Sequence, residues 1–313
     1  MLPTHTPYDG SSKLFTIGLK PLDLADWIEV DDRYEAYVAE KQWLYATIPE
    51  KVFVEEADTH AAQVEVLDRL AEHLTAHASR LFATPEQKAL FDANLAAARD
   101  RSDAPLRAAS LLIQEDLILM RRGEDGWRLA AGSLCFPSSW SLLEKFRHPL
   151  HEIHMPVPAF GPGSRMAELI YRMFDNLQGQ GVQRFNWSIQ ANADLYHPLS
   201  NVARIDRATN RPSKFPDLEA AARAFIRVER QTLRKLPASG DILFTIRIHL
   251  DPLSVLRGHP DRAALAKSFA EQITALDEAQ LDYKGLTADR GRLVRILEEM
   301  AAEPSNLQDS ALL

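Results

Sequence analysis

The sequence predicts an α+β fold, in which an antiparallel β-sheet has helices packed on one face and further helices near both ends of the chain. Two stretches, 110–136 and 225–250, each contain a glycine turn between two apolar runs, which is the pattern of a β-hairpin. Stretches with helical spacing of apolar residues precede, separate and follow these hairpins. The sequence has no internal repeats and no low-complexity tracts.

The N-terminal third predicts helices after an irregular start. The first 50 residues mix prolines and aromatics, which indicates an irregular leader plus a short helix. Residues 55–100 have leucines and phenylalanines at helical spacing, and "ATPEQK" supplies a cap with Pro85 in the first turn. We expect residues 1–100 to form a leader and helical segment that packs on a core of residues 101–313, together making one compact unit.

The first predicted hairpin is followed by shorter elements. Residues 110–122 and 127–136 form its strands around the turn "GEDG". The segment "PSSWSLLEKF" predicts a short helix, because Ser138 or Ser139 can accept hydrogen bonds from its first turn. A histidine-rich segment, a Gly/Pro loop, a helix over 164–177 and a strand over 184–189 are expected next.

The second predicted hairpin pairs residues 225–236 with 242–250 across the turn "PASGD". Alternation along its second strand places apolar side chains on one face and polar ones on the other. The apolar face comprises Ile242, Phe244, Ile246, Ile248 and Leu250, and the other Thr245, Arg247 and His249. Helices over 262–277 and 287–302 follow.

Composition excludes several classes of protein. The chain has 313 residues, 46% hydrophobic and 26% charged, as in ordinary globular proteins of one large or two modest domains. A net charge of −8 argues against a nucleic acid or an anionic membrane as partner. One cysteine excludes an intrachain disulfide framework, and we see neither a secretory signal nor a long apolar run. We therefore expect a cytoplasmic protein.

The segment "HPLHEIHMPVP" (148–158) holds three histidines followed by a rigid Pro-Val-Pro stretch. His151 and His154 are three residues apart and could share a metal ion, but no third ligand stands at a recognisable interval. All three histidines could instead lie at a helix end, where the dipole favours them. A haem iron needs one proximal imidazole, and His154, next to the prolines that fix the backbone, is best placed for it.

Other single residues have simpler interpretations. His73 and His77 are four apart on a predicted helix and are expected on a solvated face. Cys135 could be a thiolate haem ligand, but its place in a predicted strand favours a small buried side chain.

The second predicted hairpin, called the late hairpin below, has unusually many charged residues. Its first strand contains Arg227, Glu229, Arg230, Arg234 and Lys235. The strand could be an exposed edge, where alternating charges discourage aggregation. It could equally be the floor of a pocket, with arginines for haem propionates and Glu229 for a cationic amine. Further pocket candidates, which also suit ordinary strand ends or loops, are Arg184, Asn186, Trp187, Asp194, Tyr196, Tyr283 and Lys284.

Six segments occur together in a specific order, although each alone is a weak signal. They are "LLIQEDLILMRR", "GWRLAAGSLCFPSSWSLLEKF", "PLHEIHMPVP", "RFNWSI", "RVERQTLRKLPASGDILFTIRIHLDPL" and "YKGL". Together they resemble the α subunit of haem-dependent oxidative N-demethylase, over roughly residues 15–300.

The resemblance implies a PAS-like haem-binding fold and a monooxygenase-type oxidoreductase. Such an enzyme uses oxygen to demethylate a small secondary amine such as dimethylamine, giving methylamine and formaldehyde. Haem b would be bound by this chain. NADPH, flavin mononucleotide (FMN), a 2Fe–2S cluster and tetrahydrofolate are expected only on partner subunits, among them a reductase, since one cysteine cannot ligate the cluster.

The resemblance also implies site residues. His154 is the expected proximal ligand, whereas His148 and His151 match no fixed position. Trp140, Lys145, Arg230 and Trp187 are expected to contact the haem. Glu229 or Asp194 would hold the ammonium group, and Arg227 or Arg247 would stabilise charge that develops on oxygen.

Two alternatives use the same residues differently. A haem-binding PAS-type sensor or regulatory protein would have no turnover, but the sequence shows no coiled-coil heptads and no appended effector domain. A metal-dependent hydrolase would use His151 and His154. The demethylase agrees best with the sequence.

Overall fold

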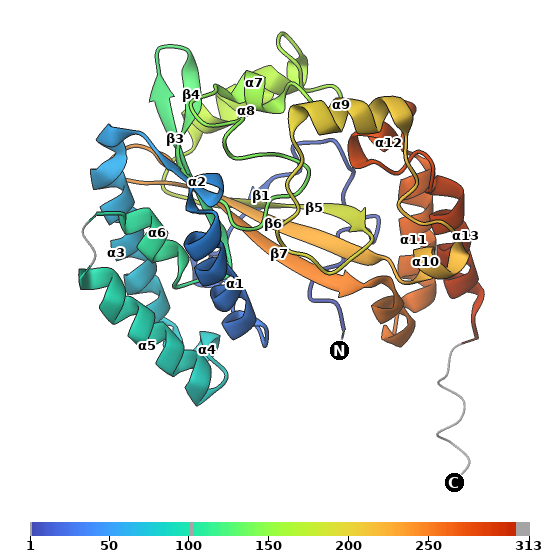
Figure 1. Ribbon diagram of the computed structural model, residues 1–313, viewed down its shortest axis with the longest axis horizontal. Helices are drawn as coiled ribbons and strands as arrows, with labels where there is room; N and C mark the ends of the chain where they lie inside the picture. The colour runs from blue at the N-terminus through green and yellow to red at the C-terminus, as the bar shows by residue number, and fades with distance from the viewer. Residues whose placement is uncertain (1, 101–102, 305–313) are drawn as a thin grey trace.

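Seven strands form one antiparallel sheet in the part of the chain that the computed structural model describes, residues 2–100 and 103–304 (Figure 1). The strand order is β1-β5-β6-β7-β3-β4-β2. The strands are β1 (Lys20–Pro21), β2 (Phe53–Glu55), β3 (Asp116–Gly123), β4 (Gly126–Ser133), β5 (Val182–Gln190), β6 (Phe225–Lys235) and β7 (Ile242–Pro252). The predicted α+β class with an antiparallel sheet is confirmed.

The late hairpin forms the centre of this sheet. β6 and β7 pair along their whole length, from Phe225↔Pro252 to Lys235↔Ile242. Gly240, with a φ of +76°, occupies the turn in a conformation that costs other residues energy. The predicted alternation holds, because Phe244 and Ile246 face a cavity whereas Leu243 packs in a hydrophobic cluster on the other side of the sheet.

The early hairpin is shorter than the sequence predicts. Residues 110–115, expected to be strand, are the end of α6 and a turn. Their carbonyl groups converge on the buried ammonium of Lys41, which accounts for the turn: Nζ donates to the carbonyls of Ser110 (3.0 Å), Ile113 (3.1 Å) and Glu115. Strand β4 ends at Ser133, and not at residue 136 as predicted.

The predicted helix over 137–146 is wrong. Ser139 and Arg147 have positive φ values of 62° and 67°, which an α-helix does not allow. The backbone N–H of Ser139 donates to the carbonyl of His197, and that of Arg147 donates to the carbonyl of Leu129 in β4. Within the segment a single turn forms instead of a helix, in which the N–H groups of Lys145 and Phe146 both donate to the carbonyl of Leu142.

Helices form three groups around the sheet. The N-terminal group is α1 (Tyr34–Thr47), α2 (Pro49–Val52), α3 (His60–Ala76), α4 (Ala78–Leu81), α5 (Pro85–Asp100) and α6 (Pro105–Ser110). The middle group is α7 (Leu150–His154), α8 (Arg165–Asn176), α9 (Asn201–Asn210) and α10 (Leu218–Ala222). The C-terminal group is α11 (Arg262–Thr274), α12 (Glu278–Lys284) and α13 (Arg290–Ala302).

Some of these helices match the predictions. The helices expected over 164–177, 262–277 and 287–302 are α8, α11 and α13. The helix in the first 50 residues, α1, has 14 residues and is longer than expected. Helices α9, α10 and α12 were not predicted, since they are short and their apolar patterns are weak.

The long helices cover one face of the sheet. Leu117, Leu119 and Leu243 share a hydrophobic cluster with the N-terminal helices, whereas Ile226 and Val228 share one with the C-terminal helices. Figure 1 shows these two groups at opposite ends of the sheet. The predicted division of the chain after residue 100 adjoins residues 101–102, which lie outside the described ones, and it stays a prediction. No helix in the described ranges has the length and apolar character of a membrane span.

Charged residues tie the N-terminal leader to the covered face. Glu29 accepts hydrogen bonds from Nε2 of His5 (2.9 Å) and Nε2 of His249 (3.0 Å), and Nε of Arg230 lies 3.4 Å from its carboxylate. Burial disfavours the carboxylate, but these partners outweigh burial and hold the pKa of Glu29 well below its usual range. His5, Glu29 and His249 have ligand atoms close enough for a metal ion. The guanidinium already neutralises the carboxylate, so the contacts are explained as an ion network.

Removing the Glu29 charge is expected to destabilise the protein. Glu29→Gln should lower the free energy of unfolding at pH 7 by about 1.5–3 kcal/mol, since a carboxylate with several donors loses its charge. The lowered pKa means that this stabilisation is complete above the unfolded-state pKa of about 4.3 and is lost as the pH falls towards the folded-state pKa. Urea unfolding should therefore show a smaller difference between wild type and variant at pH 3 than at pH 7. The exposed Glu298→Gln is the control, and an equal effect of both variants would contradict the ion network.

Candidate functional site

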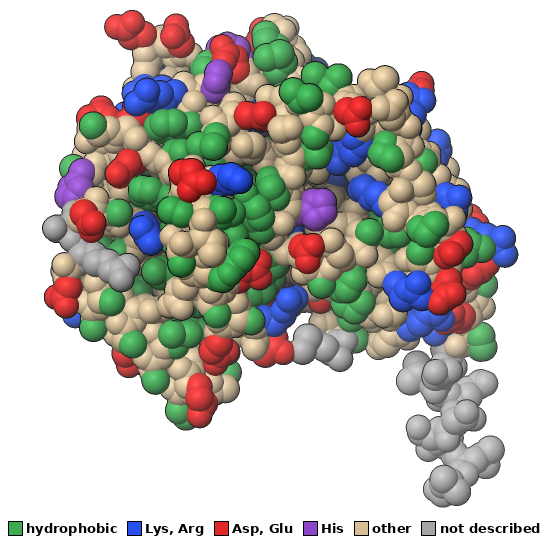
Figure 2. Space-filling model, in the orientation of Figure 1, with side chains coloured by type: hydrophobic (Ala, Val, Ile, Leu, Met, Phe, Trp, Pro, Cys, Tyr) green, Lys and Arg blue, Asp and Glu red, His purple; other side chains and the backbone are tan. Residues whose placement is uncertain are grey.

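A cavity of about 360 Å³ lies on the other face of the sheet, bounded by the middle helices and the N-terminal leader. This volume falls in the range of about 300–1,000 Å³ that small-molecule and cofactor sites occupy. Figure 2 shows the surface hollowed below the position of α9, with basic side chains gathered beside the hollow.

Much of the wall is apolar. The sheet contributes side chains from β3, β4 and β7, and the leader, the segment from Trp140 to Phe160 and helix α8 contribute the rest. The principal apolar side chains are Phe15, Ile17, Leu19, Ile118, Met120, Leu129, Trp140, Ile153, Pro156, Val157, Phe160, Ile170, Phe174, Phe244 and Ile246. Such a wall excludes water and accepts a large planar or aliphatic ligand.

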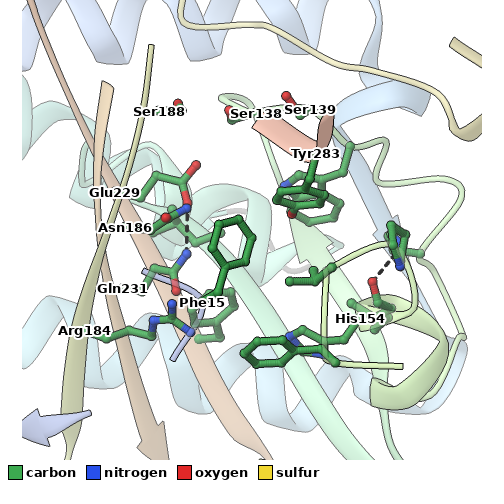
Figure 3. Close-up of a pocket in the computed structure, with 18 of the residues that line it drawn as sticks. Phe15, Ser138, Ser139, His154, Arg184, Asn186, Ser188, Glu229, Gln231 and Tyr283 are labelled. Atoms are coloured by element: carbon green, nitrogen blue, oxygen red, sulfur yellow. Dashed lines mark hydrogen bonds between the residues drawn. The ribbon is translucent and has the colours of Figure 1, made fainter. Parts of the chain in front are cut away.

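One wall, made by β5 and β6, is polar. Arg184 and Asn186 of β5 pair with Gln231 and Glu229 of β6, so their side chains share one face of the pleat. Nε2 of Gln231 donates to Oε2 of Glu229 at 2.9 Å, which fixes the carboxylate and leaves its other oxygen available. Figure 3 shows these four side chains on one side of the cavity and His154 on the other, with Phe15 between them.

His154 ends α7 with its ring fixed. Its Nδ1 donates to the carbonyl of Leu150 at 2.9 Å, because a carbonyl can only accept. Burial, with smaller effects of Arg184 and Lys145, lowers the pKa of the imidazole to about 4, so the ring is neutral at pH 7. A neutral ring with its proton on Nδ1 has a free lone pair on Nε2, as an axial metal ligand requires. Nζ of Lys145 donates to the carbonyl of Ile153 at 2.8 Å and so braces the same backbone.

The neighbouring histidines have other partners. Nδ1 of His148 contacts Glu152 at 2.5 Å, and Nδ1 of His151 contacts the Tyr171 hydroxyl at 2.7 Å. Neither histidine lines the cavity. Within the described residues, no group of three potential metal ligands includes His151 and His154, so the hydrolase alternative has no site there.

The far end of the cavity is basic. Among the described residues, Glu229 is the one carboxylate in the lining, against six lysines and arginines: Lys145, Arg184, Arg204, Arg207, Lys214 and Lys284. Nζ of Lys214 donates to the carbonyls of Ile189 and Lys284, both at 3.0 Å. Burial and nearby cations lower the pKa of Lys214 to about 7, which reflects the excess of positive charge.

Four of the predicted site residues line the cavity, namely His154, Trp140, Lys145 and Glu229. Arg227 lies on the same face of β6 as Glu229 but beyond the lining. Its guanidinium donates to the backbone carbonyls of Phe136 (2.6 Å) and Leu195 (3.2 Å) and so supports the wall from behind.

The other predicted residues lie elsewhere, which corrects their expected position. Arg230 and Arg247 point to the covered face of the sheet, where Arg230 meets Glu29 and Arg247 donates to Asp31 at 2.5 Å. The pleat causes this, because Arg230 is one residue from Glu229. Trp187 packs in the C-terminal cluster, and Asp194 is exposed in a loop where it accepts from Nδ2 of Asn192.

Sequence reasoning missed the basic residues of α9 and after it. Arg204 and Arg207 line the cavity from one side of α9, and Lys214 follows from the next loop. The signal was present in "NVARIDR", where two arginines three apart share a helix face after the N-cap Ser200. Tyr283 and Lys284, considered a loop at a helix start, also line the cavity and lie in α12.

A comparison with protein families shows which family this chain belongs to. The model described as haem-dependent oxidative N-demethylase, alpha subunit-like, matches residues 18–294, most of the chain. The chain belongs to this family. The family description implies dependence on haem and the existence of a partner subunit.

The residues present fit a haem. His154 offers one neutral nitrogen with a fixed ring, and the apolar wall suits a porphyrin. The Nε atoms of Arg184, Arg204 and Arg207 are buried without a hydrogen-bond partner among the described residues, as expected where an anionic group binds. The single cysteine does not compete for the iron, since Cys135 is fully buried and does not line the cavity.

Cys135 is expected to be unreactive in the folded protein. Burial, with the nearby Asp116 carboxylate, raises the pKa of its thiol to about 12, so almost no thiolate exists at pH 8. A disulfide reagent such as dithionitrobenzoate should label the native protein much more slowly than the protein in guanidinium chloride, where one thiol per chain should react. Equally fast labelling of the native protein would contradict the buried position.

Proposed function

We propose that this chain is the haem subunit of an oxygen-dependent oxidative N-demethylase that converts a small secondary amine into a primary amine and formaldehyde. The observation that carries this proposal is the neutral imidazole of His154, fixed through Nδ1, opposite the carboxylate of Glu229 across one cavity. The neutral imidazole can ligate a haem iron, and the carboxylate can bind the ammonium group of an amine. Membership of the family supports the same reading.

His154 would be the axial ligand of haem b. The hydrogen bond to Leu150 holds the ring plane, and Pro156 restricts the backbone that follows. Trp140 and Val157 belong to the apolar wall against which the macrocycle would lie. Bound haem would supply the iron chemistry that activates oxygen, while the protein orients the substrate.

Glu229 would bind the amine as its ammonium ion. One carboxylate oxygen accepts from Gln231, so the other is available for an ammonium N–H. The amine must lose a proton before it can be oxidised, and this free oxygen of Glu229 is the proposed acceptor. Asn186, opposite Glu229 in the strand pairing, supplies a further polar group that can orient a small ligand.

The reaction requires two electrons from outside the chain. Dimethylamine, O₂, two electrons and two protons would give methylamine, formaldehyde and water. We propose that NADPH supplies the electrons through a reductase partner with FMN and a 2Fe–2S cluster, because one buried cysteine cannot hold such a cluster. Tetrahydrofolate on another subunit would accept the one-carbon product, in the cytoplasm.

The choice of axial ligand can be tested by absorbance. His154→Ala should abolish the Soret band of purified, haem-reconstituted protein or weaken haem retention by at least tenfold, because the imidazole that the Leu150 carbonyl holds in place is lost. His151→Ala should retain haem, since that ring contacts Tyr171 instead. Equal retention by both variants would rule out His154 as the ligand, and a wild type without a Soret band would end the proposal.

The amine site can be tested separately from the haem. Glu229→Gln should leave the Soret band in place and weaken the dimethylamine-induced spectral change by about 10–100-fold in Kd, because a charge-assisted hydrogen bond is lost. Formaldehyde release with NADPH and an added reductase should fall in parallel. The control is exposed Glu168→Gln on α8. Unchanged amine affinity in Glu229→Gln would place the amine elsewhere, and binding without formaldehyde release in the wild type would indicate a sensor.

A further inference from the structure

Three arginines of the cavity lining have buried atoms without a partner. The Nε atoms of Arg184, Arg204 and Arg207 make no hydrogen bond within the described residues. These residues come from two separate elements, β5 and α9, yet all three line the same cavity. A buried guanidinium N–H without an acceptor is unfavourable, and the gathering of three such arginines around one cavity, with one carboxylate among its described lining residues, favours an anionic ligand there.

The rest of each guanidinium is also poorly satisfied. Arg207 donates to the carbonyl of Tyr283 (2.6 Å) and, over 3.4 Å, to Oγ of Ser139. The side chains of Arg184 and Arg204 donate no hydrogen bond to any described residue. Burial lowers the pKa of Arg184 and of Arg207, and Glu229 only partly offsets this at Arg184. Glu229 is the one carboxylate among the described lining residues, whereas the three guanidinium groups have donors for several carboxylates.

The three guanidinium groups surround one phenol. Burial and the Glu229 carboxylate raise the pKa of Tyr283 to about 12, and Arg204, Arg207 and Arg184 each oppose that rise. All three arginines line the same cavity as Tyr283, and Arg207 donates to the backbone carbonyl of that residue. Arg204 and Arg207, three residues apart in α9, project from neighbouring turns.

Helix α9 lacks the usual apolar anchor. None of its residues is buried, and Val202 and Ile205 are 77% and 59% exposed on its outer side. Its start is held by the Glu144 carboxylate, which accepts the backbone N–H of Asn201 at 2.8 Å. An isolated ten-residue helix is marginally stable, so a ligand bound by its inward arginines would fix it in place.

We propose that Arg204, Arg207 and Arg184 form a carboxylate-binding site that takes the two propionates of haem and thereby fixes α9 over the cavity. This inference rests on the proposed function, since it assigns the anionic edge of the cofactor for which His154 supplies the axial nitrogen. Planar guanidinium groups bind carboxylates through paired N–H donors, and the guanidinium groups of Arg184 and Arg204 line the cavity without an acceptor among the described residues. The iron end and the propionate end of one ligand thus have separate sites in one cavity.

The test compares haem with its dimethyl ester, which has the same iron and macrocycle but no carboxylates. Each is titrated into the full-length apoprotein, and Kd is read from the Soret band. Wild type should bind haem about 10–100-fold more tightly than the ester, as charge-assisted hydrogen bonds predict. In the double variant Arg204→Met and Arg207→Met, haem binding should weaken towards that of the ester, whereas binding of the ester should change little.

Hydrogen exchange supplies a second readout that does not depend on a variant. Amides of α9 should exchange more slowly in the haem complex than in the ester complex, because only haem has carboxylates for the arginines.

The control for the affinity titration is Arg223→Met, which removes an exposed arginine paired with Glu219 and should keep the wild-type preference for haem over the ester.

The outcomes separate the two proposals. Equal affinity of wild type for haem and ester, with equal exchange in α9, would overturn the carboxylate site and leave the role of His154 intact. Absence of a Soret band with both ligands would overturn the haem function itself. A wild-type preference that persists in the double variant would assign the propionates to other cations and contradict this inference.

Discussion

The pleat of β6 decides which face of the sheet each charged residue of this central strand occupies. Glu229 and Gln231 face the cavity, and Arg230 between them faces the leader, because neighbouring side chains point to opposite faces of a sheet. A shift of pairing by one residue would exchange these positions and place an arginine where the proposed amine site has its carboxylate. The full-length pairing of β6 with β5 and β7 prevents such a shift.

Charged residues on the two faces of the sheet differ in how they are paired. On the covered face, Arg230 and Arg247 are direct cross-strand neighbours, and Glu29 and Asp31 of the leader neutralise them. On the cavity face, six cations meet one carboxylate, and three arginine Nε atoms have no partner among the described residues. Arginines that form ion pairs with carboxylates are typical of a structural network, whereas several buried arginines without an ion pair at one cavity are typical of a site that binds an anion.

Two parts of the cavity wall, His154 and helix α9, also differ in how firmly the fold holds them. His154 is fixed by a backbone carbonyl, its preceding backbone is braced by Lys145, and prolines follow it. Helix α9 is its opposite, with no buried residue and arginines as its inward contacts. The fold thus holds the His154 imidazole firmly at one part of the cavity and holds α9 less firmly at another.

The sequence by itself determined the α+β class, the hairpin of β6 and β7, and the helices α8, α11 and α13. Each of these depends on local signals, namely apolar periodicity and turn glycines. Only the tertiary structure decided that residues 137–146 do not form a helix, since Ser139 donates to His197 and Arg147, directly after the segment, donates to Leu129. It alone also placed Arg247 and Trp187 behind the sheet and brought Arg204, Arg207 and Lys214 to the cavity. Those positions depend on strand register and on contacts between distant segments, which no local pattern specifies.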